Sequence, residues 1–160
     1  MTLEGDKARK DKRATKGNCL TVQESAFLDR SRIAHLATAD KSGEPHVVPV
    51  CFIRVGMEIF ITIDQKPKRN NELKRLRNIA ENLSVALTVD HYDDSDWSKL
   101  GWLMLRGEAI ILYNGSSHDV AQEILRQKYR QLRKMELESL PVIAIQIAKV
   151  TSWGDLTPHA

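Results

Sequence analysis

Apolar and polar residues alternate along several stretches of the chain, a pattern that predicts β-strands. Successive side chains of a strand point to opposite faces of a sheet, so one face of each predicted strand can be buried. Pro49 cannot donate a backbone hydrogen bond, so its strand lies at a sheet edge or leaves its backbone open to another group. Gly107 predicts a bulge or bend in the longest strand. The six predicted strands span residues 33–39, 46–54, 58–64, 83–91, 100–113 and 141–153.

Three other segments repeat their apolar residues at helical spacing. Thr21 and Glu24 have the spacing of a capping box at the start of the first segment, and Ser116 and Asp119 open the last one. In the second segment, Arg75 is expected on the outward face. The predicted helices span residues 21–30, 70–82 and 116–135. Because the strands come in groups joined by tight turns, and do not alternate one by one with helices, the pattern favours an α+β fold built on an antiparallel barrel.

Length and composition fit one folded domain. Of the 160 residues, 42% are hydrophobic, and we expect residues 19–160 to form the domain and residues 1–18 to be a disordered leader. The net charge is +3, and most of the excess lies in that leader, which argues against a nucleic-acid-binding face. No apolar stretch approaches the roughly 20 residues of a membrane span. Cys19 and Cys51 lack metal-ligand spacing, and the default expectation is a reducing cytoplasm.

The strongest candidate for chemistry lies where the third predicted strand ends. Thr62 and Asp64 close that strand, and the turn after it contains Lys66, Lys68 and Arg69, followed by a helix. Arginine can hold phosphate oxygens through two parallel hydrogen bonds, lysine neutralises charge, and a helix N-terminus adds N–H donors. The pattern therefore predicts an anion site suited to a phosphate. The alternative is a solvated basic turn in front of a basic helix.

The segment 90–96 is rich in aspartate and contains His91, which suggests a metal site. It lacks, however, the glycine and the final glutamate that a calcium loop needs at their spacings. We therefore expect no metal there. The acids are expected to face water or to pair with Lys99 or Arg106.

Two tryptophans and two histidines can each be interpreted either as structural residues or as functional ones. Trp97 follows the acidic loop, and Trp102 shares a predicted strand face with Arg106. Each indole would either cover a planar ligand or pack against neighbours. His35 and His46 lie in predicted strands and fit structural histidines. Since no nucleophile has an activating partner, any catalysis would be carried by a bound cofactor.

Two runs stand out when these elements are taken in order, DQKPKR at residues 64–69 and VDHYDDSDW at residues 89–97. Together with the strands HLAT, VVPVCF and IFITID and the helix ELKRLRNIAEN, they resemble the split β-barrel flavin- and deazaflavin-binding proteins related to pyridoxamine 5'-phosphate oxidase. Within that family the chain is most similar to a deazaflavin-dependent subgroup. The resemblance spans about residues 27–153. It implies a six-stranded antiparallel split β-barrel with peripheral helices, and a homodimer with cofactor sites between its subunits.

The resemblance also implies where the cofactor would bind. The flavin ring would lie along the second strand, the phosphate at the end of the third strand and its turn, and the partner's long strand would close the groove. The residues implied are Val48, Pro49 and Val50 for the ring, Thr62, Asp64, Lys66, Lys68 and Arg69 for the phosphate side, and Trp97 and Trp102 for the closing strand. The chain departs from the oxidase pattern at Val48 and Ile53, where the oxidase has an arginine and a lysine. This departure favours the deazaflavin F420, with FMN as the alternative.

The implied function is hydride transfer between F420 or FMN and a small organic substrate, in a cytoplasmic homodimer without nucleic-acid or membrane partners. A bound water or a weak acid would deliver the proton, and no catalytic side chain is identified. The alternative is a non-catalytic protein that carries FMN, F420 or haem. Haem would use His35, His46 or His91 as ligand.

Overall fold

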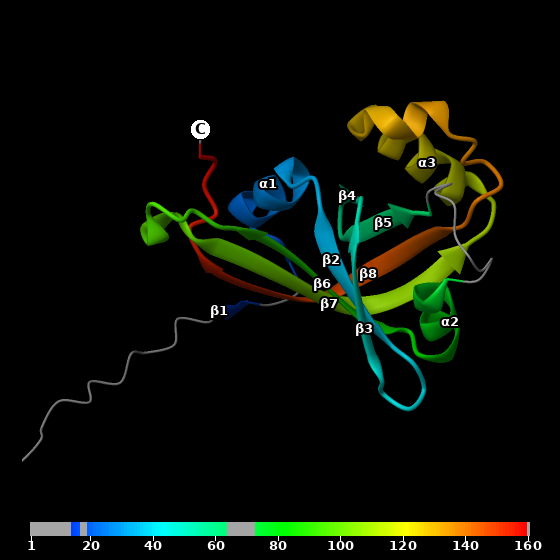
Figure 1. Cartoon of the computed structure of the whole chain (residues 1–160), viewed down its shortest axis with the longest axis horizontal. Coiled ribbons are helices and arrows are strands. Elements are labelled where there is room, and N and C mark those ends of the chain that lie inside the picture. The colour runs from blue at the N-terminus through cyan, green and yellow to red at the C-terminus, as the bar shows by residue number, and fades with distance from the viewer. Residues whose placement is uncertain (1–13, 17–18, 64–72, 160) are drawn as a thin grey trace, which may run out of the picture.

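A computed structural model describes residues 14–16, 19–63 and 73–159 of the chain (Figure 1). Its strands are β1 Ala14–Lys16, β2 Ala34–Ala39, β3 Pro45–Val50, β4 Ile53–Val55, β5 Glu58–Thr62, β6 Ser84–His91, β7 Gly101–Leu112 and β8 Val142–Gly154. Its helices are α1 Val22–Arg30, α2 Lys74–Glu81 and α3 Ser116–Lys128, with two short 3-10 helices, η1 Trp97–Lys99 and η2 Arg130–Lys134.

The strands form one antiparallel sheet in the order β3-β2-β6-β7-β8-β5-β4, and β1 pairs with β8. The long strands β7 and β8 run through the middle, and the shorter strands curl around them (Figure 1). Helix α3 and η2 lie beside β4 and β5 at one end of the sheet (Figure 1). The α+β class and the antiparallel arrangement predicted from the sequence are thus confirmed.

The strand predicted at residues 46–54 is interrupted at Cys51 and Phe52, so that it forms β3 and β4 instead. The reason is that Phe52 bonds to the end of α3. Its N–H donates to Tyr129 Oη (3.0 Å), and its carbonyl oxygen accepts from Tyr129 Oη (2.8 Å) and from Lys128 Nζ (3.1 Å). These partners are not strand groups, so the ladder of the sheet stops here.

A further strand lies in the stretch that we expected to be a disordered leader. Residues 14–16 form β1 and pair with β8, and residues 1–13 and 17–18 lie outside the described residues. With β1 and the divided strand, the described chain has eight strands where the pattern predicted six.

The helix ends agree with the sequence prediction at one helix and differ at the others. The capping box of α1 is confirmed, because Glu24 N–H donates to Thr21 Oγ1 (3.1 Å) and Thr21 N–H donates to Glu24 Oε2 (2.8 Å). The cap predicted at Ser116 is wrong: α3 is preceded by Gly115, whose φ of 101° suits glycine. The long helix expected at 116–135 stops at Lys128 and continues as η2. The start of the helix expected at 70–82 lies outside the described residues.

The bulge predicted at Gly107 is confirmed, since the pairing of β7 with β8 shifts register between Arg106 and Gly107. A Cβ at this position would lie 1.9 Å from the Gln146 carbonyl oxygen. Only glycine therefore allows the two backbones to approach this closely.

Alternation in the strands builds the main core inside the curled sheet. In β6, for example, Val85, Leu87 and Val89 are buried and their neighbours are more exposed. A second cluster fills the space under α3, where Leu125 and Leu132 pack with β5 and β8. Fully burying one such side chain contributes about 1.5–3 kcal/mol.

Cys19 is exposed, Cys51 is half-buried, and no disulfide joins them. None of the helices in the described ranges is both long enough and apolar enough to cross a membrane.

Candidate functional site

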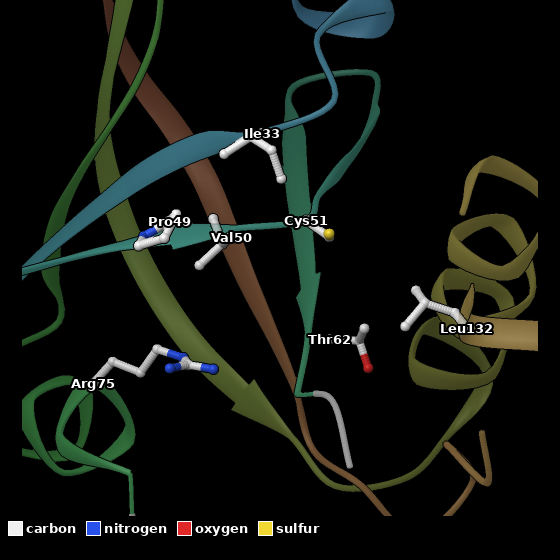
Figure 2. Close-up of a pocket in the computed structure, with 7 residues that line it drawn as sticks. All are labelled: Ile33, Pro49, Val50, Cys51, Thr62, Arg75 and Leu132. Carbon is white, nitrogen blue, oxygen red and sulfur yellow. The ribbon is translucent and has the colours of Figure 1, made fainter. Parts of the chain in front are cut away.

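A pocket of about 160 Å³ lies where β3 breaks off, next to the end of β5 and the start of α2 (Figure 2). We call it the β3–β5 pocket. Its lining residues come from five parts of the chain and are Ile33, Pro49, Val50, Cys51, Thr62, Arg75 and Leu132.

The β3 side of this pocket offers backbone and small apolar side chains. Strand β3 is at one end of the strand order and pairs only with β2 among the described strands, so the edge position predicted from Pro49 is confirmed. Pro49 is exposed and Val50 is buried, and both line the pocket. Val48 packs against the main core and is not among the lining residues.

The opposite side of the pocket offers a hydroxyl and a guanidinium. Thr62 ends β5, and among the described residues its hydroxyl makes only a long contact of 3.5 Å with the Ile63 carbonyl oxygen. Arg75 extends its guanidinium from α2 toward the space between β3 and the end of β5 (Figure 2). Arginine presents several N–H donors in a planar fork that matches phosphate or carboxylate oxygens.

The prediction that Arg75 faces outward is therefore wrong. Arg75 lies three and four positions before Asn78 and Ile79, both of which are buried, so it shares their side of α2. The spacing of Arg75 from Asn78 and Ile79 indicates this orientation in the sequence, whereas the charge of the side chain favours an outward one. An arginine can satisfy both, because its aliphatic stem can lie over a core while its guanidinium lies in a polar pocket.

Four residues predicted to bind the cofactor, Asp64, Lys66, Lys68 and Arg69, lie outside the described residues. The described chain stops at Ile63, next to Thr62, and resumes at Leu73, two residues before Arg75. Both points thus adjoin the β3–β5 pocket.

The two predicted tryptophans do not line this pocket. Trp97 lies in η1 and is 69% exposed. Trp102 is half-buried on β7, where it pairs with Asp90 on one side and Trp153 on the other. The β6–β7 connection lies at the opposite end of the sheet from α2 (Figure 1). Trp102 and Arg106 alternate onto one face of β7, as predicted.

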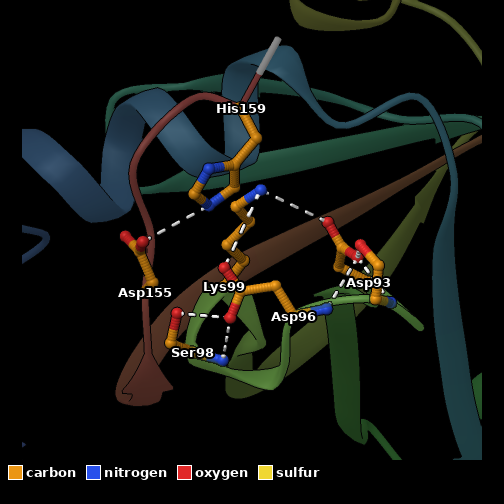
Figure 3. Close-up of polar contacts among 7 residues, drawn as sticks. Asp93, Asp96, Ser98, Lys99, Asp155 and His159 are labelled. Carbon is orange, nitrogen blue, oxygen red and sulfur yellow. Dashed lines mark hydrogen bonds and ion pairs between the residues drawn. The ribbon is translucent and has the colours of Figure 1, made fainter.

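Asp93 and Asp96 of the acidic loop bond to nearby serines and pair with Lys99 (Figure 3). Asp93 accepts hydrogen bonds from the Ser95 hydroxyl (2.6 Å) and backbone N–H (2.9 Å), which lower the pKa of Asp93 to about 2. Lys99 Nζ lies 3.7 Å from Asp93 and 3.9 Å from Asp96. The pairing of the acids with Lys99 is therefore confirmed. Across the described ranges, no group of three or more His, Cys, Asp or Glu side chains is arranged to hold a metal ion.

The histidines differ in their surroundings. His35 is exposed and His46 half-buried. His91 stacks on His159 with ring centroids 5.1 Å apart, and His159 Nε2 lies 3.3 Å from Asp155 Oδ2 (Figure 3). His118, which the sequence analysis did not single out, is buried and bonds through both ring nitrogens, to Asp119 Oδ1 (2.9 Å) and to the Leu140 carbonyl oxygen (2.8 Å).

The curled antiparallel sheet, open between β3 and β4 and flanked by helices, defines a protein of the split β-barrel class. Residues 20–154 match the family model described as pyridoxamine 5'-phosphate oxidase, and the chain belongs to this family. The search of curated proteins gave no match.

Solved structures with the same fold are distant in sequence. A conserved hypothetical protein from Mycobacterium tuberculosis is 18% identical, with a TM-score of 0.69 over 91% of this chain and 96% of that one. An FAD-binding protein from Mesorhizobium loti is 20% identical, with a TM-score of 0.62 over 83% and 94%. The haem storage protein of Vibrio cholerae is 16% identical, with a TM-score of 0.60 over 82% and 96%.

Proposed function

We propose that this protein is a cytoplasmic oxidoreductase that binds the deazaflavin F420 or FMN and transfers hydride between that cofactor and a small organic substrate. The observation that carries the proposal is that Thr62 and Arg75 line the same side of the β3–β5 pocket. The sequence between these two residues adds Lys66, Lys68 and Arg69. Hydroxyl, guanidinium and ammonium donors together suit a phosphate group. Family membership and an FAD-binding neighbour agree with a flavin-like ligand.

The residues present fit one end of such a cofactor. About 160 Å³ is less than the roughly 300–1,000 Å³ of a site that encloses a whole small molecule. The β3–β5 pocket would therefore take the phosphate, and the ring would extend along the exposed edge of β3 past Pro49. Arg75 and Thr62 would neutralise and orient the phosphate, and Val50 and Ile33 would exclude water from the apolar side.

The bound cofactor supplies the hydride chemistry, and this chain supplies position. Holding the phosphate on Arg75 fixes one end of the ligand, so that fewer orientations of the ring remain. The β3 edge has backbone groups that can meet the polar side of a flavin-like ring. Within the described residues no titratable side chain lines the β3–β5 pocket besides Arg75 and Cys51.

We further propose that the working unit is a homodimer that buries the outer face of the sheet. Ile33, Val47 and Trp153 are 49%, 60% and 43% exposed, and Val47 and Trp153 point to the same outer face as their partners Ala37 and Trp102. A large exposed apolar face marks an interaction surface. In such a dimer Trp102 of one subunit would close the groove of the other, since Trp102 is remote from the pocket of its own chain. Sedimentation equilibrium should give twice the chain mass of 18.2 kDa, and Val47→Asp should shift the protein toward the monomer.

Titration with FMN and with the deazaflavin, followed by absorbance and fluorescence, tests the proposal. Binding weaker than about 100 μM for both, roughly 5.5 kcal/mol, would refute it. Arg75→Gln should weaken binding by about 1.5–3 kcal/mol, the usual value of a charge-assisted hydrogen bond. Arg77→Gln is the matched control, because Arg77 is exposed on the same helix. Lys68→Ala and Arg69→Ala should each act like Arg75→Gln.

A second candidate function is cofactor or haem carriage without turnover. It is favoured by buried ring nitrogens that have no hydrogen-bond partner among the described residues, His46 Nδ1 and His91 Nε2. Either lone pair could ligate iron. The neighbours include a haem storage protein and a haem-binding protein from Mycobacterium smegmatis. Haem titration that gives a Soret band in the native protein, but not in His46→Ala or His91→Ala, would support this candidate. Rapid reoxidation of bound reduced cofactor by an organic acceptor would favour the oxidoreductase.

A further inference from the structure

A second, larger cavity adjoins the β3–β5 pocket. We call it the η2 pocket because η2 forms one wall. Its volume of about 510 Å³ falls within the roughly 300–1,000 Å³ typical of small-molecule sites. The residues that matter for its chemistry are Arg32, Cys51, Tyr129, Arg130, Leu132 and Met135. Cys51 and Leu132 line both cavities, so a ligand here would lie directly beside the proposed cofactor site.

The floor of the η2 pocket is apolar and firmly held. Tyr129 and Leu132 are buried and belong to the cluster under α3, and Met135 packs against that cluster. The ring of Tyr129 is fixed through its hydroxyl, which bonds to the backbone of Phe52. A rigid apolar surface of this kind binds an apolar ligand without first losing side-chain freedom.

The rim of the η2 pocket carries two guanidinium groups. Arg32 donates to the Lys128 carbonyl oxygen (2.7 Å) and lies 5.0 Å from the centroid of the Tyr129 ring. A guanidinium has five N–H donors, so most of those of Arg32 remain available to a ligand. The side chain of Arg130 has no hydrogen bond or ion pair with another described residue.

No carboxylate lines the η2 pocket, so no acidic side chain in its lining neutralises the charges of Arg32 and Arg130. Lys128, the last residue of α3, lies close to the same positive charge. Its pKa is lowered to about 8, first by burial and then by the charge of Arg32, while Asp29 and Cys51 act in the opposite sense. An anion bound at the rim would relieve the repulsion between these cations.

We infer that the η2 pocket binds an apolar carboxylate, and that an unsaturated member of this class is the substrate of the neighbouring redox site, where one carbon of its C=C bond would take hydride from the reduced cofactor and the other a proton from water. The apolar body would lie on Tyr129, Leu132 and Met135. The carboxylate would lie between Arg130 and Arg32, which suit it because a guanidinium can bond both of its oxygens. Only the role as substrate rests on the proposed function, since binding of the carboxylate can be measured without cofactor.

Isothermal titration calorimetry of the full chain without cofactor tests the inference. The probes are naphthoate and its uncharged isostere naphthamide. Naphthoate should bind at least about tenfold more tightly than naphthamide, because only the carboxylate gains charge-assisted hydrogen bonds. Equal binding of the two, or no binding of naphthoate at about 1 mM, would overturn the inference.

Two variants locate the site. Arg130→Gln should weaken naphthoate binding at least about tenfold and leave naphthamide unchanged, and Met135→Trp should fill the pocket and abolish binding of both. Lys134→Gln is the matched control, since Lys134 is an exposed cation on η2 outside the lining, and it should change nothing. A loss of naphthoate binding in Arg75→Gln with none in Arg130→Gln would place the anion in the β3–β5 pocket and overturn the assignment.

Failure of this inference is distinguishable from failure of the proposed function. Arg130→Gln should leave the affinity for FMN and for the deazaflavin unchanged, because the cofactor phosphate is assigned to Arg75. If the cofactors bind and naphthoate does not, only the substrate class is lost. If naphthoate binds and the cofactors do not, the oxidoreductase proposal is lost and the carboxylate site stands.

Discussion

The hydroxyl of Tyr129 connects the end of α3 to the break between β3 and β4, and its removal is the sharpest test of how that break is held. Tyr129 Oη accepts from the Phe52 N–H (3.0 Å) and lies 2.8 Å from the Phe52 carbonyl oxygen and 2.9 Å from the Arg32 carbonyl oxygen. One hydroxyl proton serves the two carbonyls. The variant Tyr129→Phe removes these bonds and keeps the ring.

The expected loss of folding stability follows from the hydrogen bonds that the Phe52 carbonyl oxygen and N–H lose in this variant. The Phe52 carbonyl oxygen keeps the bond from Lys128 Nζ (3.1 Å), so the loss of the donated bond costs about 1 kcal/mol. The Phe52 N–H belongs to a fully buried residue and would lose its only bond in the described chain, which costs about 1–3 kcal/mol. We therefore expect a destabilisation of about 2–4 kcal/mol. For a protein of this size, about 3 kcal/mol corresponds to a fall in Tm of roughly 6–12 °C.

Urea denaturation followed by circular dichroism measures this cost, and Tyr113→Phe is the control. Tyr113 is 65% exposed, so its variant should stay within about 0.5 kcal/mol of the native chain. If Tyr129→Phe also stays within that limit, the break between β3 and β4 is not held by this hydroxyl.

Burial raises the pKa of Tyr129 to about 12, so as the pH rises past the ordinary pKa of tyrosine the hydroxyl ionises in the unfolded chain before it does in the folded one. The native chain should therefore lose stability above about pH 10, and Tyr129→Phe should lose less of it.

Three further predictions use other parts of the molecule. Burial lowers the pKa of His118, but bonds to the Leu140 carbonyl and to Asp119 outweigh it and raise the pKa above its ordinary value. The stability from His118 should therefore be complete below about pH 6.5 and should fall as pH rises through the folded-state pKa, a slope that His118→Gln should remove in urea titrations at several pH values. Gly107→Ala should cost at least about 1–3 kcal/mol, because its Cβ would meet the Gln146 carbonyl, and an unchanged urea midpoint would show that the bulge yields easily. Thr21→Ala should cost about 1 kcal/mol by removing one side of the capping box of α1, which a thermal melt beside the control Ser139→Ala at an exposed position would detect.

Local patterns in the sequence predict much of this fold. Alternation places the buried residues of β6 and β7 correctly, and Thr21 with Glu24 marks the start of α1, because each signal acts over only a few residues. The end of the predicted strand at 46–54 was missed for the opposite reason. Its partner Tyr129 is 77 positions away from Phe52, and alternation carries no information about a bond of that range.

The candidate site was predictable only in part, and the reasons are again physical. Thr62 and Pro49 were found because a strand end and a prolyl residue have local signatures. Arg75 was missed because its charge suggested solvent, while its spacing to Ile79 suggested the inside of the molecule. The η2 pocket could not be found from the sequence, since Arg32 and Arg130, which line it together, are 98 positions apart in the chain.

The interruption at Cys51 and Phe52 accounts for both cavities at once. An unbroken strand would have continued the ladder past Cys51 and left no gap between β3 and the end of α3. Because Tyr129 and Lys128 take over the backbone groups of Phe52, the ladder ends without leaving that carbonyl and N–H unpaired. The gap that results has the β3–β5 pocket on the side of Arg75 and the η2 pocket on the side of Arg130, with Cys51 and Leu132 as the common wall. One local break, satisfied by one helix end, thus places the proposed cofactor pocket and an apolar, arginine-rimmed pocket next to each other, which is the arrangement that the proposed hydride transfer between two bound molecules would require.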